Sequence, residues 1–188
     1  KMNWKIPLFK MYWDTQDIVA VTRGIKRGSY WTMGPEIQTL EENIAGFIGK
    51  KYGVSFNSGT SALHATLLAY DIKHGAEVIV PSFTFIATAN VVVLTGATPV
   101  FADIEKQSYA LDPEDVKEKI TSKTKAILPI HYGGGPCKNI KALQEIAKDH
   151  HLVLLEDAAE SLGAKIHNRR ADIVKCVETL RSLKDRFG

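Results

Sequence analysis

Residues 57–63, Asn57-Ser58-Gly59-Thr60-Ser61-Ala62-Leu63, connect a predicted strand to a predicted helix. The strand is a short apolar run at residues 54–56 that looks buried, and the helix is an apolar pattern that runs to Gly75. A strand that turns through Ser-Gly-Thr-Ser into a helix leaves backbone N–H groups free at the helix N-terminus, where a phosphate can bind. Glycine and serine also form ordinary tight turns, so the motif alone leaves both interpretations open.

The composition indicates a soluble globular protein, because 45% of the 188 residues are hydrophobic and 24% are charged. The net charge is only +3 and the basic residues are scattered, so we expect no nucleic-acid surface. Cys137 and Cys176 lie far apart without neighbouring metal ligands, so we expect reduced thiols and no metal site. Neither a membrane span nor a signal peptide is predicted, and we expect a cytoplasmic protein that does not contact membranes.

Strand and helix patterns alternate along the chain. Besides residues 54–56, strands are predicted at residues 77–80, 98–102, 125–130 and 152–155. Helices are predicted at residues 14–27, from 35 to near Gly53, within 83–94, from Pro113 behind the capping residue Asp112, and at 139–150. This alternation predicts the α/β class, with a mostly parallel sheet and helices on both faces.

In open α/β sheets, ligands bind beyond the carboxyl ends of the strands. The segments that follow the predicted strands are residues 57–60, 82–85, 103, 131–133 and 156–157. Together they place phosphate donors, an aromatic ring, carboxylates and a histidine at one edge of the sheet. Pyridoxal phosphate (PLP) uses such a set: its phosphate is anchored, an aromatic ring stacks on its pyridine, and a carboxylate keeps the ring nitrogen protonated.

Five segments resemble the DegT/DnrJ/StrS-type sugar-nucleotide aminotransferases, which are fold-type-I PLP enzymes. They are residues 34–36 (Gly-Pro-Glu), 57–63, 81–90 (PSFTFIATAN), 96–103 (GATPVFAD) and 156–161 (EDAAES). They occur in the expected order, and the resemblance spans about residues 5–167. It implies an enzyme that passes an amino group from a glutamate-type amino-acid donor to a keto-sugar nucleotide, and a homodimer.

The resemblance also implies cofactor-binding roles for individual residues. Asp157 would pair with the pyridine nitrogen, and Phe85 would stack on the ring. Glu160 stands where many relatives have Gln or His near the cofactor's phenolic oxygen. The implied phosphate binders are Gly59, Thr60 and Ser61.

Three further residues resemble positions close to the substrate in this family. Trp31 and Thr32 resemble residues near the sugar site, although plain packing is the other interpretation for Trp31. His131 begins a His-Tyr-Gly segment similar to a family loop. It has either a role toward substrate or the role of a buried histidine that orients the loop.

We expect three parts along the chain. Residues 1–13 form an aromatic N-terminal arm, which packs either on its own domain or on a partner subunit. Residues 14–170 form the PLP-binding large domain, incomplete by comparison with the family. Residues 171–188 form an amphipathic C-terminal helix.

The lysine that forms a Schiff base with PLP in this family does not appear after Asp157. Lys175 and Lys184 lie on the polar side of the predicted helix at residues 171–188 and fit a solvated position. A truncated or deleted gene product, a fragment expressed by itself, and a longer chain joined across a gap all remain open. We expect these residues alone to be inactive. The alternatives are a PLP-dependent sugar dehydratase and a non-catalytic remnant with a binding or regulatory role.

Overall fold

The computed structural model describes residues 5–6, 10–166 and 169–170 of the chain. It divides into two units, Lys1–Leu40 and Glu41–Gly188, which are treated separately below. The predicted C-terminal helix and most of residues 1–9 of the arm lie outside the described residues. Among the described helices, none has the length and apolarity needed to cross a membrane.

In the first unit, helix α1 (Thr15–Arg27) begins and ends at local capping signals. The Asp14 carboxylate accepts from the Asp17 N–H at 3.4 Å, and the Asp17 carboxylate accepts from the Asp14 N–H at 2.8 Å. This capping box satisfies N–H groups that have no partner within the helix. Gly28 ends the helix in the left-handed conformation, with φ 71°. The prediction of a helix at residues 14–27 is confirmed.

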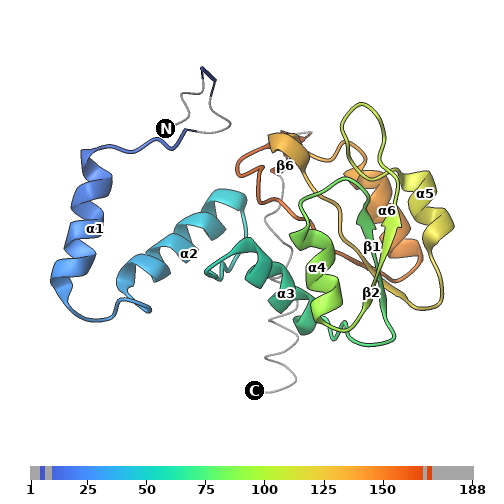
Figure 1. Ribbon diagram of the computed structural model, residues 1–188, viewed down its shortest axis with the longest axis horizontal. Coiled ribbons are helices and arrows are strands. Elements are labelled where there is room, and N and C mark those ends of the chain that lie inside the picture. The colour runs from blue at the N-terminus through green and yellow to red at the C-terminus, as the bar shows by residue number, and fades with distance from the viewer. Residues whose placement is uncertain (1–4, 7–9, 167–168, 171–188) are drawn as a thin grey trace. The chain divides into compact units, whose positions relative to one another are not determined.

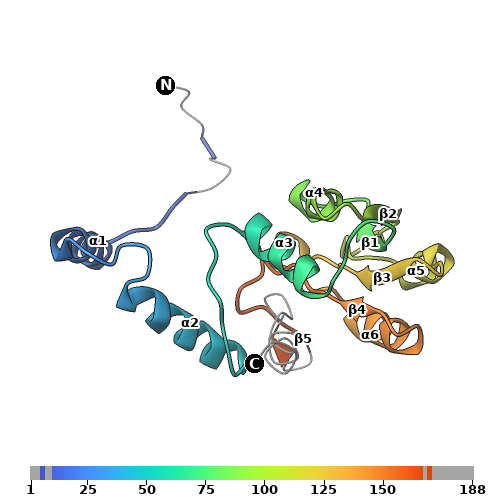
Figure 2. The same cartoon turned by 90° about the horizontal axis from the view of Figure 1, so that it is seen from below.

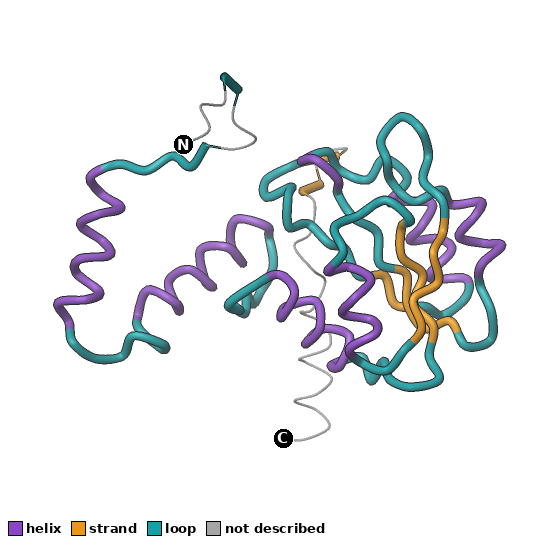
Figure 3. Tube along the Cα trace, in the orientation of Figure 1, coloured by secondary structure: helices purple, strands orange, loops and turns teal. Residues whose placement is uncertain are grey.

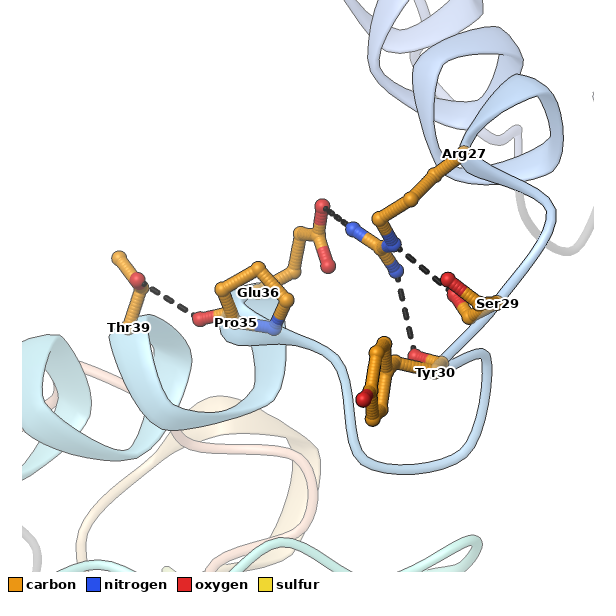
Figure 4. Close-up of polar contacts among 6 residues, drawn as sticks. All are labelled: Arg27, Ser29, Tyr30, Pro35, Glu36 and Thr39. Carbon is orange, nitrogen blue, oxygen red and sulfur yellow. Dashed lines mark hydrogen bonds and ion pairs between the residues drawn. The ribbon is translucent and has the colours of Figure 1, made fainter.

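Arg27 organises the turn between α1 and helix α2 (Pro35–Ile48). Its Nε donates to the Ser29 carbonyl at 3.0 Å, its Nη2 to the Tyr30 carbonyl at 3.2 Å, and its Nη1 to Glu36 Oε1 at 2.5 Å (Figure 4). These contacts form the Arg27 clasp. The hydrogen bond from Arg27 also lowers the pKa of Glu36 from its usual value.

The segment after α2 differs from the prediction in two respects. Helix α2 ends at Ile48, followed by Gly49 with φ 75°, and does not continue to Gly53. The predicted buried strand at residues 54–56 is wrong, because this run forms no strand and its residues are exposed. The Ser55 N–H donates to Glu41 Oε1 at 2.7 Å. The Glu41 side chain thus binds the backbone N–H that would otherwise donate to a neighbouring strand.

The second unit contains a parallel sheet, whose strands are orange in Figure 3. The strand order is β2-β1-β3-β4. Its elements, after helix α3 (Gly59–Ala69), are β1 (Glu77–Pro81), α4 (Ala87–Leu94), β2 (Thr98–Ala102), α5 (Pro113–Lys119), β3 (Thr124–Ile127), the 3-10 turn η1 (Tyr132–Gly134), α6 (Ile140–Asp149) and β4 (Val153–Leu154). Two further strands, β5 (Lys165–Ile166) and β6 (Arg169–Arg170), pair antiparallel. Four of the five predicted strands and the α/β class are confirmed.

Helices cover both faces of the sheet, with α3 and α4 on one side and α5 and α6 on the other (Figures 1 and 2). Neighbouring strand residues alternate between the two faces. In β1, Val78 and Val80 face the core under α3 and α4, whereas Ile79 faces the core under α5 and α6. Leu111 and Val116, at the start of α5, both belong to this second core. The side chains of β1 therefore contribute to both cores.

Candidate functional site

The helices of the second unit bring their N-termini to the carboxyl edge of the sheet. Helix α4 starts after the carboxyl end of β1, and helix α3 ends shortly before the amino end of β1. The two helices pack against each other. Both helices therefore run from the carboxyl edge toward the amino edge, which places residues 57–61 and 82–88 on the side where such sheets bind ligands.

The N-terminus of α3 keeps hydrogen-bond donors free for an anion. The N-cap Ser58 Oγ accepts from the Ser61 N–H at 3.1 Å and lies 3.0 Å from Ser61 Oγ. Within the described part of the chain, the N–H groups of Gly59 and Thr60 have no hydrogen-bond acceptor. A Cβ added at Gly59 would meet no atom within 4 Å, so none of the described residues fills the space beside it. Open space, free N–H groups and the helix dipole together suit a phosphate.

Asp157 is a buried carboxylate, 6% exposed, that follows β4. Its Oδ2 accepts from Thr88 Oγ1 at 3.0 Å, and its Oδ1 accepts from the Ala159 N–H at 3.2 Å. No cationic side chain pairs with Asp157 among the residues that the structure describes. A buried carboxylate normally has a cation or a metal beside it, so this site suits a positively charged ligand group.

Phe85 and Asp157 are connected through Thr88. The Thr88 N–H donates to the Phe85 carbonyl at 3.1 Å in the first turn of α4, while the Thr88 hydroxyl donates to Asp157. Phe85 itself is 69% exposed, so the faces of its ring are open to a ligand. The predicted stacking residue and the predicted partner of the ring nitrogen therefore belong to one connected cluster.

His131 is fully enclosed and uses both ring nitrogens inside the protein. Its Nε2 lies 3.0 Å from Glu156 Oε2, and its Nδ1 accepts from the Cys137 N–H at 2.8 Å. Because Nδ1 is an acceptor, Nε2 carries the proton and donates it to the carboxylate. The side chains of His131 and Glu156 are 1% and 2% exposed, respectively. This geometry favours the interpretation that His131 orients its loop.

Cys137 lies at the end of the same loop. Burial is the main cause that raises the pKa of its thiol to about 12. The thiol is therefore protonated at neutral pH and is a poor nucleophile. A catalytic role for Cys137 is not supported.

Glu160 contacts the loop that His131 begins. Its Oε2 accepts from the Gly133 N–H at 2.7 Å. Gly133 and Gly134 both adopt positive φ angles, 60° and 83°, which favour glycine. The ring of Tyr132 lies 4.7 Å from that of Phe83, centroid to centroid, so the loops after β1 and β3 also touch through their aromatic side chains.

Trp31 and Thr32 belong to the first unit, in the turn that the Arg27 clasp holds. Both are exposed, and their placement near a sugar stays a prediction. Thr88 and Glu156 are the residues that the sequence interpretation did not assign to the site. The position of Glu156 directly before Asp157 could have indicated that it belongs to the site. For Thr88, the only indication in the sequence was its position one helical turn after Phe85.

The model of the DegT/DnrJ/EryC1/StrS aminotransferase family matches residues 13–179. The UDP-2-acetamido-2-deoxy-3-oxo-D-glucuronate aminotransferase of Pseudomonas aeruginosa is 40% identical over 152 residues, which are 81% of this chain and 42% of that protein. The GDP-perosamine synthase of Vibrio cholerae is 36% identical over 174 residues, which are 93% of this chain and 47% of that protein.

Among solved structures, a GDP-4-keto-6-deoxymannose-3-dehydratase with a trapped PLP-glutamate geminal diamine superimposes with a TM-score of 0.80 at 31% identity. The match covers 88% of this chain and 44% of that one. The chain thus spans less than half of the length of each of these relatives.

Proposed function

Since the chain belongs to the DegT/DnrJ/EryC1/StrS aminotransferase family, whose aminotransferases depend on PLP, we propose that it forms the cofactor-holding part of a sugar-nucleotide aminotransferase. One observation carries this proposal. Asp157 is a buried carboxylate with hydroxyl and N–H donors but without a cation among the described residues. A protonated pyridine nitrogen supplies the missing positive charge.

The other residues of the edge fit the remaining parts of the cofactor. The N–H groups of Gly59 and Thr60 and the hydroxyl of Ser61 would bind the phosphate at the N-terminus of α3. Phe85 would cover one face of the ring and exclude water from it. Glu160 would lie toward the phenolic oxygen while it holds the Gly133 N–H.

When bound, PLP supplies a ring that withdraws electrons from the substrate carbon. Asp157 supports this chemistry because its carboxylate keeps the proton on the ring nitrogen. His131 and Glu156 hold the loop beside Asp157. Their side chains are hydrogen-bonded, and the backbone N–H of His131 donates to the backbone carbonyl of Asp157 at 3.0 Å. In this role His131 positions the site and does not exchange protons with substrate.

The proposed substrates are a keto-sugar nucleotide and a glutamate-type amino donor. The UDP-sugar and GDP-sugar named in the two relatives support this substrate class. A sugar dehydratase is the second candidate, because the solved GDP-4-keto-6-deoxymannose-3-dehydratase superimposes on the chain with a TM-score of 0.80. Comparing amino transfer with loss of water on the same keto-sugar nucleotide, in a preparation that also contains the Schiff-base lysine, distinguishes the two candidates.

We further propose that the protein is a homodimer. Large apolar side chains of the first unit are exposed and could pack against a second copy. They include Met11, Tyr12, Trp13, Trp31 and Met33. Light scattering at micromolar concentration should give twice the mass of one chain, and a clean monomer would count against the dimer.

The decisive experiment is titration of the 188-residue chain with PLP, followed by absorbance and fluorescence. We expect saturable binding that inorganic phosphate competes away, and Asp157→Ala should weaken it by about tenfold or more, as expected for a lost charge-assisted contact. After excess PLP is removed, borohydride should fix no cofactor at this site, because the proposed binding is noncovalent, and amino transfer should be absent. Failure of the chain to bind PLP, or equal binding by Asp157→Ala, would overturn the proposal.

A further inference from the structure

We propose that Thr88 is a positioning residue, which holds the Asp157 carboxylate toward the ring nitrogen of the cofactor through a chain of two hydroxyl groups. Thr84 is the second member of this chain. The inference rests on the proposed function, because it concerns the same cofactor. Neither threonine would contact the ring nitrogen of the cofactor itself, and both would act through Asp157.

The hydrogen bonds define a direction along the chain. Thr84 Oγ1 and Thr88 Oγ1 lie 2.8 Å apart, and Thr88 Oγ1 lies 3.0 Å from Asp157 Oδ2. An ionised carboxylate only accepts, so Thr88 donates to Asp157. Each hydroxyl has one proton, so Thr84 must donate to Thr88. The order is Thr84 to Thr88 to Asp157.

Burial means that only the Thr88 hydroxyl can make this contact with Asp157. Thr88 is 0% exposed, and water therefore cannot replace its hydroxyl at Asp157. Hydrogen bonds of this kind are stronger in a buried environment than at a surface. Thr88 is also fixed by its helix, since the next turn of α4 places Val91 and Val92 in the core.

The chain determines which way the carboxylate faces. The described donors occupy one position on each oxygen: Thr88 on Oδ2 and the Ala159 N–H on Oδ1. Each carboxylate oxygen can accept a second hydrogen bond. With both oxygens held, the carboxylate cannot rotate, and its remaining acceptor positions stay in place for one N–H donor from the ligand. Without the Thr88 hydroxyl, only the Ala159 N–H would restrain it.

The test measures the affinity of the 188-residue chain for two probes, PLP and 1-deaza-PLP, in which a C–H group replaces the ring nitrogen. Thr88→Val keeps the shape of the side chain and removes the hydroxyl, whereas Thr88→Ser keeps the hydroxyl. The control is Thr95→Val at the other end of α4, where the lost hydrogen bond goes to the Val92 carbonyl at 2.8 Å and not to the site.

We expect Thr88→Val to weaken PLP binding by about tenfold, the typical loss for a hydrogen bond to a charged group, and Thr88→Ser to restore most of it. Binding of 1-deaza-PLP should be unchanged in all variants, since it has no ring nitrogen for Asp157 to hold. In an Asp157→Ala background, Thr88→Val should have no further effect on PLP. A merely structural role of Thr88 would weaken both probes equally and in both backgrounds.

The outcomes separate this inference from the proposed function. If PLP does not bind the unsubstituted chain, the proposed function fails and the role of Thr88 fails with it. If PLP binding depends on Asp157 but is equally strong in Thr88→Val and Thr95→Val, only the role of Thr88 is overturned. If Thr88→Val does not fold, Thr84→Val tests the same chain, with an expected loss of about threefold that is again confined to PLP.

Discussion

Helix α1 buries none of its residues, whereas β1 buries four of its five. The first unit is organised by polar contacts between residues close in sequence: the capping box at Asp14, the left-handed Gly28 and the Arg27 clasp. The second unit is organised by two apolar cores whose members come from distant elements. Changes in the first unit should therefore have local effects, and changes in the second should affect the whole unit.

The largest effect is expected from Leu67→Ala in α3. Leu67 is completely buried in the core under α3 and α4, so its truncation should lower the free energy of unfolding by about 3 kcal/mol. Urea unfolding measures this change. Leu68→Ala is the matched control, because the neighbouring side chain is 53% exposed. Similar losses for the two variants would contradict the assignment of Leu67 to the core.

The next effect is expected from His131→Ala. It removes the buried donor to Glu156 and the acceptor for the Cys137 N–H, and should cost about 2 kcal/mol of unfolding free energy. Lys73→Ala serves as the control, since the Lys73–Asp71 pair is exposed and such pairs contribute little. Equal unfolding free energies for His131→Ala and Lys73→Ala would contradict the role of His131 in holding its loop.

Gly34→Ala tests the Arg27 clasp with a smaller expected effect. An added Cβ would lie 2.5 Å from Arg27 Nη2 and 2.7 Å from the Tyr30 carbonyl oxygen, so the clasp must open. Hydrogen exchange of α1 amides should accelerate by about tenfold, while amides of α6 should not change. Gly24→Ala lies within α1, where an added Cβ meets no atom within 4 Å, and should slow exchange because alanine favours helices. Faster exchange in α6 would mean that the effect is not local.

The smallest effect is the pH dependence of the clasp. Because Arg27 lowers the pKa of Glu36 in the folded state, the contribution of this pair is complete above the unfolded value of about 4.3. It is lost as the pH falls through the lower folded value. NMR titration of the Glu36 carboxyl group should show an upward shift of its pKa in Arg27→Gln. Glu41 is the control, because its lowered pKa comes from Ser55 and should not respond.

The two regions also differ in how well the sequence predicts them. Capping signals are local, so the Asp112 start of α5 could be predicted directly, and the bounds of α1 could be predicted to within one residue. The four strands of the sheet appear as short apolar runs, and β1, which is buried at four of its five residues, shows this most clearly. Residues 54–56 have the same apolar character, yet their Ser55 N–H binds the Glu41 side chain, a contact that the pattern does not encode.

The prediction of the candidate site from the sequence is limited in the same way. Asp157 and Phe85 could be predicted as a pair, because each follows a strand of the parallel sheet and the carboxyl ends of such strands meet at one edge. The same argument placed residues 57–61 there through a strand at residues 54–56 that does not form. The Thr88–Asp157 hydrogen bond joins residues 69 positions apart, and no local sequence pattern predicts it. The pairing of His131 with Glu156 is likewise set by the register between neighbouring strands, through the bridge from Ile130 to Asp157.

The alternation of β1 side chains between the two cores limits how the length of this protein can change during evolution. One inserted residue within β1 would exchange the places of Val78, Ile79 and Val80, so that each core would receive side chains shaped for the other. Substitutions of similar volume are tolerated far better than such insertions. We therefore expect length variation in the segments that follow the strands, such as residues 82–86 and 131–139. Those segments belong to the proposed ligand edge, so new substrate preferences could arise there while the sheet stays unchanged.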